Sequence, residues 1–232
     1  MTNNNLKIIP SGDSAILVRL GNEITEEINT RVHDLHFMLD VLKIKGIIEM
    51  VPAYADLLIL YDPLKVSYDG LSQIIKEEIE KPGKPGTIEQ RLIQIPVCYD
   101  EEFGSDLEEV SEHTGLSKKE IIQIHSSTKY LVYMLGFTPG FSYLGGMDER
   151  IACPRKKIPR QNIPAGSVGI ADKQTGIYPI ESPGGWQLIG RTPLNLFDPD
   201  REDVFLCRAG DHLQFVPISK TEFESIKIAQ DK

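Results

Sequence analysis

Cations gather in one short stretch of a chain that is acidic overall. They are Arg150, Arg155, Lys156, Lys157 and Arg160, all within eleven residues. Prolines at positions 154, 159 and 164 restrict the backbone between them, which lowers the entropic cost of presenting these side chains. A guanidinium group binds a carboxylate or a phosphate through two parallel hydrogen bonds. We therefore predict that Arg155, Arg160 and the later Arg191 bind a small anion. For Lys156 and Lys157, a solvated loop that pairs with acidic surface groups is the better interpretation.

The segment 136–193 surrounds these cations with turns and aromatic rings. It holds ten of the chain's 19 glycines and seven of its 15 prolines, yet its aromatic residues and short apolar runs argue against disorder. Glycines let main-chain N–H groups approach a ligand closely. Besides the three arginines, the predicted pocket residues are Phe141, Tyr143, Gln174, Thr175, Tyr178, Ser182, Gly184, Gly185 and Trp186. For the 182–186 turn, a plain tight turn with Trp186 in the core is an equally good interpretation.

No residue stands out as a general acid or base, so the catalytic residues stay unassigned. The five histidines form no ligand motif, and none lies within 136–193. Cys153 precedes Arg155 closely, where a positive field would lower the pKa of its thiol, although a lone cysteine in a loop is usually inert. Three widely spaced cysteines suit neither a disulfide framework nor zinc ligation. We predict no metal site.

Composition excludes several classes of partner. A net charge of −9 disfavours general binding to nucleic acid or to an anionic membrane. The helical pair expected over 105–125 has the length of a helix-turn-helix, but its acidic residues are wrong for contact with phosphates. No phosphate-binding loop occurs, no apolar run approaches a membrane span, and the first residues lack the pattern of a signal peptide. A reduced cytoplasm is the expected location.

Two domains are expected from the pattern of the elements. Residues 1–85 predict a small α+β unit, with a strand over 14–20, a helix over 25–42, two strands over 46–62 and a helix over 69–81. A further strand at 91–97 would complete a split βαβ, ferredoxin-like arrangement. The Pro-Gly pairs of 81–87 predict a linker.

Residues 86–232 carry the segment 136–193 and predict a β-barrel. Capping boxes at Ser105 and Ser117 begin two short helices, and another at Ser219 begins a last helix. Between them, short apolar runs separated by Gly and Pro predict about six strands, the last two at 204–209 and 212–218.

Long motifs within this region resemble a known family. GFTPGFSYLGG, CPRKKIPR, IPAGSVGIA, QTGIYPIESPGGW and IGRTPL closely resemble the signature of the bacterial 5-oxoprolinase B-subunit family, also called the KipI or allophanate-hydrolase subunit 1 family. The resemblance extends along the whole chain. It implies an α+β N-terminal domain and a cyclophilin-like β-barrel.

The resemblance also implies a function that needs partners. Such a protein works with the KipA-like C subunit of 5-oxoprolinase and with its A subunit to cleave 5-oxoproline to L-glutamate with ATP, and is inactive alone. The ATP site cannot be assigned to this chain. Under this interpretation Arg155 and Arg160 clamp the anion, and Gln174, Thr175 and Tyr178 orient the substrate. Two alternatives stay open: a regulator that inhibits autophosphorylation of a sporulation histidine kinase, and a component of a urea or allophanate pathway.

Overall fold

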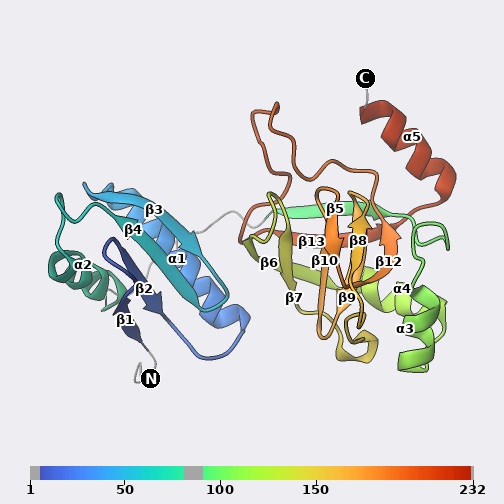
Figure 1. Cartoon of the computed structure of the whole chain (residues 1–232), viewed down its shortest axis with the longest axis horizontal. Helices are drawn as coiled ribbons and strands as arrows, with labels where there is room; N and C mark the ends of the chain where they lie inside the picture. The colour runs from blue at the N-terminus through green and yellow to red at the C-terminus, as the bar shows by residue number, and fades with distance from the viewer. Residues whose placement is uncertain (1–5, 81–90, 231–232) are drawn as a thin grey trace. The chain divides into compact units, whose positions relative to one another are not determined.

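The computed structural model describes residues 6–80 and 91–230, and the chain divides into two compact units, Met1–Glu89 and Gln90–Lys232 (Figure 1). The predicted boundary between residues 85 and 86 and the predicted linker at 81–87 lie outside the described residues. Within the described residues, no helix has the length and apolar character needed to span a bilayer.

The first unit is a four-stranded antiparallel sheet with two helices on one face. Its elements are β1 (Lys7–Pro10), β2 (Ala15–Arg19), α1 (Glu26–Leu42), β3 (Ile47–Pro52), β4 (Asp56–Tyr61) and α2 (Tyr68–Glu80), and the strand order is β1-β2-β4-β3. Burial alternates along β2 and β4, which turns Ile16, Val18 and Ile59 toward Leu35 of α1 and Leu71 of α2. The unit thus has its own apolar core.

The ferredoxin-like arrangement is not confirmed for this unit. The strand predicted at 91–97 forms as β5 (Leu92–Val97), but it belongs to the second unit, where it pairs in parallel with β13 (His212–Pro217). The edge position beside β2 is taken instead by β1, which the sequence analysis did not predict. A four-residue strand with little alternation gives too weak a pattern to recognise alone.

The second unit is built on a seven-stranded sheet that is nearly closed into a barrel. Besides β5 and β13 it contains β6 (Lys129–Leu135), β7 (Ser142–Gly145), β9 (Ser167–Ala171), β10 (Gln174–Ile177) and β12 (Gln187–Arg191), in the order β12-β9-β10-β7-β6-β13-β5. The two end strands meet where Cys98 and Arg191 exchange main-chain hydrogen bonds, each of 2.9 Å. The barrel expected from the sequence is present in this general form.

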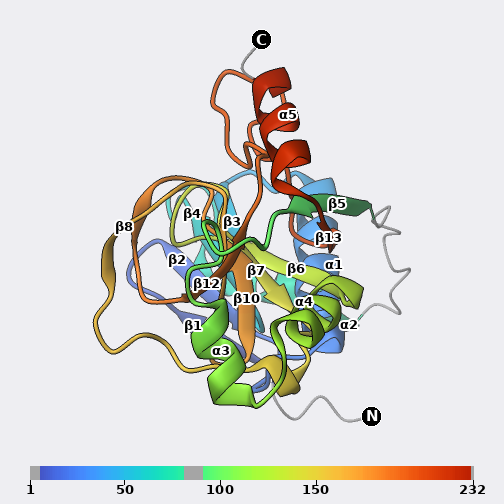
Figure 2. The ribbon, with the colours of Figure 1, turned by 90° about the vertical axis from the view of Figure 1, so that its right-hand side faces the viewer.

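Smaller elements complete the second unit. They are α3 (Leu107–Thr114), α4 (Lys118–Ser127), the 3-10 helix Glu149–Ile151, β8 (Arg160–Ile163), β11 (Ser182–Gly184) and α5 (Lys220–Gln230). In Figures 1 and 2, α3 and α4 lie beside each other against the barrel, where α3 contacts β12 and α4 contacts β13. Strands β8 and β11 form a separate two-stranded sheet.

Two expectations for this unit were wrong in detail. The strand expected over 204–209 is a loop with a single bridge between Phe197 and Phe205. Of its apolar residues only Cys207 is buried, so the run does not form a ladder in the barrel. The capping box at Ser105 does not form: Asp106 is the N-cap, and its side chain turns to other partners. The capping boxes at Ser117 and Ser219 form as predicted.

Candidate functional site

A two-stranded sheet places the cation-bearing segment beside the glycine turn. Strands β8 and β11 pair so that Arg160 lies opposite Gly184. The main-chain N–H of Lys156 donates to the carbonyl oxygen of Gly185 at 2.7 Å. The segment that carries Arg155 and Arg160 therefore runs alongside the 182–186 turn. The structure brings these predicted site residues together.

A buried carboxylate organises the cations at this place. Asp106 is 4% exposed, and its Oδ1 accepts a hydrogen bond from the Arg160 guanidinium at 2.6 Å and lies 3.1 Å from Nζ of Lys156. Its Oδ2 accepts from the main-chain N–H of Leu188 at 2.7 Å. Lys156 also donates to Glu109 at 2.5 Å. Two carboxylates thus neutralise two cations, and Arg160 holds Asp106 rather than an open anion site, which corrects its predicted role.

Gln187 extends the network toward a carbonyl group. Its amide nitrogen donates to Oε1 of Glu109 at 3.0 Å and to the carbonyl oxygen of Pro154 at 3.1 Å. Hydrogen bonds from Lys156 and then from Gln187 lower the pKa of Glu109. Because both neighbours are acceptors, the orientation of the Gln187 amide is fixed. Its carbonyl oxygen is buried and has no hydrogen-bond partner within the described part of the chain.

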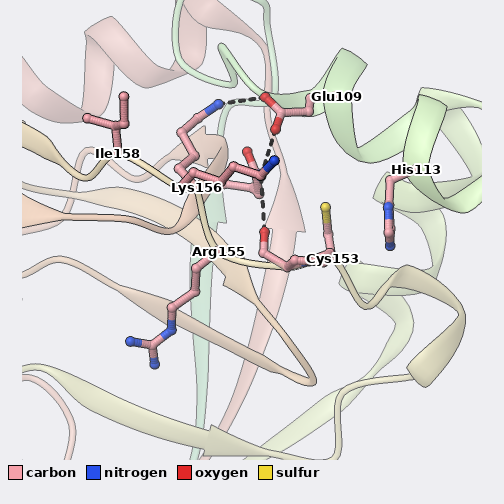
Figure 3. A pocket seen from close by; sticks show the side chains of 9 residues that line it. Glu109, His113, Cys153, Arg155, Lys156 and Ile158 are labelled. Carbon is pink, nitrogen blue, oxygen red and sulfur yellow. Dashed lines mark hydrogen bonds and ion pairs between the residues drawn. The ribbon is translucent and has the colours of Figure 1, made fainter.

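A cleft of about 470 Å³ opens beside this network (Figure 3). It is lined by Glu109, His113, Cys153, Pro154, Arg155, Lys156, Lys157, Ile158 and Gln187. Two walls form it: helix α3 provides Glu109 and His113, and the 153–158 loop provides the cations and Ile158. The volume suits a small molecule.

Arg155 is the arginine most available to a ligand in this cleft. Its side chain is 58% exposed, and its ion pair with Asp172 is long, 3.6 Å between Nε and Oδ2. In Figure 3 its guanidinium group points away from the Lys156–Glu109 pair. An exposed pair of this kind is weak, so a carboxylate ligand competes with Asp172 at little cost. The anion-binding role of Arg155 stays a prediction, and its exposure and its place in the cleft lining are compatible with it.

Helix α3 supplies cleft residues that the sequence analysis missed. Glu109 and His113 lie in the helical pair expected over 105–125, to which no role in the site was given, and Gln187 of β12 was not among the predicted site residues. The available signal was charge complementarity, because an acidic helix start and a basic loop occur in one domain. Lys156 pairs with acidic groups as expected, although within the network rather than on an open surface.

The predicted aromatic residues form a packed cluster behind the turn. Phe141 contacts Tyr143, Tyr178 and Trp186 edge to face, with ring centroids 5.0, 5.7 and 5.6 Å apart. Trp186 is 6% exposed and does not line the cleft, so the core interpretation of this residue holds. A β-carbon added at Gly184 would lie 2.3 Å from the Tyr178 hydroxyl oxygen, so only glycine fits there. The cluster supports the turn from within.

Other predicted residues lie away from the cleft. The hydroxyl of Thr175 is fully buried and donates to the Gly169 carbonyl, so it cannot orient a ligand. Arg191 ends β12, at the opposite end from Trp186, and donates to the Ala165 carbonyl at 2.8 Å. Ser182 is buried in β11. These three positions correct the predicted pocket. Gln174 begins β10, two residues after the Asp172 partner of Arg155.

Cys153 lies in the cleft, and the pKa of its thiol is shifted upward rather than downward. Burial raises the pKa of its thiol, and the negative charge of Glu109 adds to that effect. The hypothesis of a lowered pKa is therefore wrong, and the inert interpretation holds. Among the described residues, no group of His, Cys, Asp and Glu side chains is arranged to hold a metal ion.

We expect Cys153 to resist alkylation in the folded protein. Cys153 is 2% exposed, and the raised pKa of its thiol leaves little thiolate, which is the reactive form. Mass spectrometry after iodoacetamide treatment at pH 7.5 should show an unmodified Cys153, and full modification after denaturation in guanidinium. Rapid labelling of the native protein would contradict this assignment.

Comparison with known proteins places this chain in a carboxyltransferase-related family. Residues 6–207 match the family Carboxyltransferase domain, subdomain C and D. The B subunit of 5-oxoprolinase from Bacillus subtilis (strain 168) is 46% identical over 93% of this chain and 94% of its own length. That of Escherichia coli O157:H7 is 41% identical over 89% of this chain and 93% of its own. The chain therefore belongs to this family, within its group of 5-oxoprolinase B subunits, as the motifs predicted.

Other relatives carry the same region inside longer chains. TTHA0988, whose crystal structure has been solved, is 38% identical to this chain in the matched region. The two structures superpose with a TM-score of 0.79, and the match covers 88% of this chain and 40% of TTHA0988. Urea amidolyase of Lachancea kluyveri is more distant, 26% identical over 92% of this chain and 13% of its own length. The same region thus occurs both as a separate polypeptide and joined to other domains.

Proposed function

We propose that this chain is the B component of a cytoplasmic, ATP-dependent 5-oxoprolinase that opens 5-oxoproline to L-glutamate together with the A and C components of that enzyme. The observation that carries the proposal is the similarity to curated 5-oxoprolinase B subunits over nearly the whole of both chains. The motifs imply a cyclophilin-like form for the barrel, but no isomerase activity follows from it, because fold and function are separable.

The cleft suits one end of this substrate. 5-Oxoproline carries a carboxylate on a small ring, and Arg155 offers an exposed guanidinium at the cleft wall. The apolar side chain of Ile158 and the polar edge formed by Glu109 and Gln187 complete the surroundings of the ring. In this account the chain holds and orients the substrate, and groups of the companion polypeptides complete the reacting centre.

The residues present do not fit the triphosphate of ATP. Lys156 and Arg160 are both paired with Asp106, which leaves Arg155 and Lys157 as the exposed cations of the cleft. A triphosphate needs a glycine-rich loop or several convergent cations. We therefore place ATP on another component of the enzyme and derive no step of its chemistry on this chain.

Reconstitution tests the proposal. The A and C components from the same genome are mixed with this chain, and L-glutamate is measured with 5-oxoproline and ATP. Release that requires all three chains and ATP supports the proposal. Stimulation of ATP hydrolysis by urea, with none by 5-oxoproline, would instead favour the urea-pathway alternative. The histidine-kinase alternative remains a prediction.

Replacing Arg155 by alanine is expected to raise the KM for 5-oxoproline about tenfold or more, because a charge-assisted pair to the carboxylate is lost. The midpoint of thermal unfolding should change little, since the side chain is exposed and its ion pair is long. Steady-state kinetics of the reconstituted complex and thermal unfolding of the isolated chain measure the two properties. Lys157→Ala is the matched control, an exposed cation of the same loop. An equal rise in KM for both variants would show that the effect comes from the loss of one positive charge and not from a specific contact of Arg155.

A further inference from the structure

The β6–β7 turn holds an aromatic residue outward in a strained conformation. Phe137 has a φ of 64°, a left-handed value that is rare for a bulky residue. The N–H of Thr138 donates to the carbonyl of Gly136 at 2.7 Å, so the chain reverses tightly around Phe137. The hydroxyl of Thr138 is buried and has no hydrogen-bond partner in the described structure. Such strain persists only where the surrounding structure enforces it, and it is typical of functional positions.

The strained turn leaves a large apolar side chain in solvent. Phe137 is 65% exposed, and its ring contacts Phe141 of the aromatic cluster, with centroids 5.6 Å apart. Pro139 of the same turn is also exposed. Neither residue is needed to fill the barrel core. The exposure of these two side chains therefore does not stabilise the isolated chain.

The β6–β7 turn packs on the connection between β12 and β13. A β-carbon added at Gly140 would lie 3.1 Å from Cβ of Phe197, so this turn packs directly on Phe197. Phe197 stacks on Phe205 at 5.6 Å, and Phe205 is 37% exposed. In Figures 1 and 2 this connection extends beyond the barrel as an open loop. Phe137, Pro139, Phe197 and Phe205 together form what we call the Phe137 patch.

The rim of the Phe137 patch is acidic. Residues 198–203 carry four carboxylates and one arginine, and Arg201 pairs with Asp198 at 3.2 Å. Asp200 and Glu202 are exposed and take part in no ion pair of the described residues. An apolar centre with a charged rim is the usual anatomy of a protein interface. The charge of this rim is complementary to lysine or arginine on an opposing surface.

We propose that the Phe137 patch is where the C component of the enzyme docks, through an apolar projection flanked by basic side chains. The inference rests on the proposed function, since it takes this chain to be one component of a complex. In TTHA0988 the same region makes up 40% of a longer chain, so there it is joined to further polypeptide. Because Phe141 joins Phe137 to the cluster that supports the 182–186 turn, docking there also couples assembly to the site.

Phe137→Gly separates docking from folding. Glycine adopts a positive φ without strain, so this variant should unfold at a higher temperature than the wild type. The same variant loses the aromatic anchor, and its Kd for the C component should rise about tenfold or more. Phe137→Leu should keep most of the affinity. Ile228→Ala, which trims an exposed apolar residue of α5, is the matched control and should change neither property.

Isothermal titration calorimetry with the full-length chain and the C component measures these affinities. Asp200→Lys combined with Glu202→Lys should also weaken binding, and added salt should weaken wild-type binding more than that of the double variant. Unchanged affinity in Phe137→Gly would overturn the proposal. So would sedimentation that shows the patch joining two copies of this chain instead. If the C component binds through Phe137 but the complex does not turn over 5-oxoproline, the docking inference is supported and the proposed function is rejected.

Discussion

Replacing Asp106 by alanine is expected to lower the free energy of unfolding by about 3 kcal/mol, which is typical when one partner is removed from a buried ion pair. The substitution leaves Arg160 and Lys156 without their shared carboxylate. It also leaves the main-chain N–H of Leu188 buried without an acceptor. Both effects act in the same direction, because each group remains largely covered in the folded state. Urea unfolding followed by circular dichroism measures the change.

Two companion variants separate these contributions. Asp106→Asn removes the charge but retains an oxygen that can accept from Leu188, so its loss should be smaller than that of Asp106→Ala. Glu108→Ala, in the first turn of α3, removes an exposed ion pair with Lys118 of α4 and should cost less than about 1 kcal/mol. If Asp106→Ala were as stable as Glu108→Ala, the network would not organise the cleft.

Acidification is expected to destabilise the second unit through His125. The ring is fully buried, and burial lowers its pKa from 6.5 to about 3. Its Nδ1 lies 2.8 Å from the Tyr99 hydroxyl and its Nε2 lies 2.9 Å from the Thr175 hydroxyl. Because Thr175 donates to Gly169, it accepts from Nε2–H, and Nδ1 accepts from Tyr99. The interior therefore holds a neutral imidazole in one tautomer.

The direction of the pH dependence follows from which state of the chain, folded or unfolded, binds the proton more readily. Below pH 6.5 the unfolded chain protonates His125, whereas the folded chain does so only near pH 3. The unfolded state therefore binds more protons as the pH falls, and the free energy of unfolding falls with it. At about 1.4 kcal/mol per pH unit, the total loss attributable to this residue between pH 6.5 and pH 3 approaches about 5 kcal/mol. Stability is retained above pH 6.5.

Urea unfolding at a series of pH values from 7.5 to 4 measures this slope. His125→Gln should be less stable at pH 7.5, because packing on Phe215 is lost, but its stability should decline less steeply with acid. His113→Gln, at an exposed position of α3, should keep the wild-type slope. The same slope in His125→Gln as in the wild type would show that other groups govern acid unfolding.

The long periodic elements could be predicted from the sequence because their signals are local. The apolar spacing that gave helix 25–42 is that of α1, and Ser117 with Glu120 marked the start of α4 correctly. The strand 91–97 was also recognised, but its partner was not. Pairing with β13 joins residues that are 120 apart in the chain, and no local pattern encodes such a contact. The barrel could therefore be expected in general form, without its register.

The candidate site could be predicted only in part, because its contacts also join residues that lie far apart in the chain. The spacing of Pro and Arg indicated an anion-binding loop, and that loop does lie along the cleft beside Gly184 and Gly185. The sequence did not show that Asp106, 54 residues before Arg160, would occupy its guanidinium group. Thr175 was misread because a hydroxyl in a strand can face either way. Burial decides that choice, and burial is a property of the whole fold.

The central claim is that Arg155 binds the carboxylate of the substrate. Calorimetric titration of the reconstituted complex and its Arg155→Ala variant, with 5-oxoproline and with 2-pyrrolidinone, tests it directly, because the second ligand is the same lactam without the carboxylate. The account predicts that either change alone weakens binding about tenfold or more, and that both together weaken it no further. Independent, additive losses would contradict the account, because the arginine and the carboxylate would then not be partners.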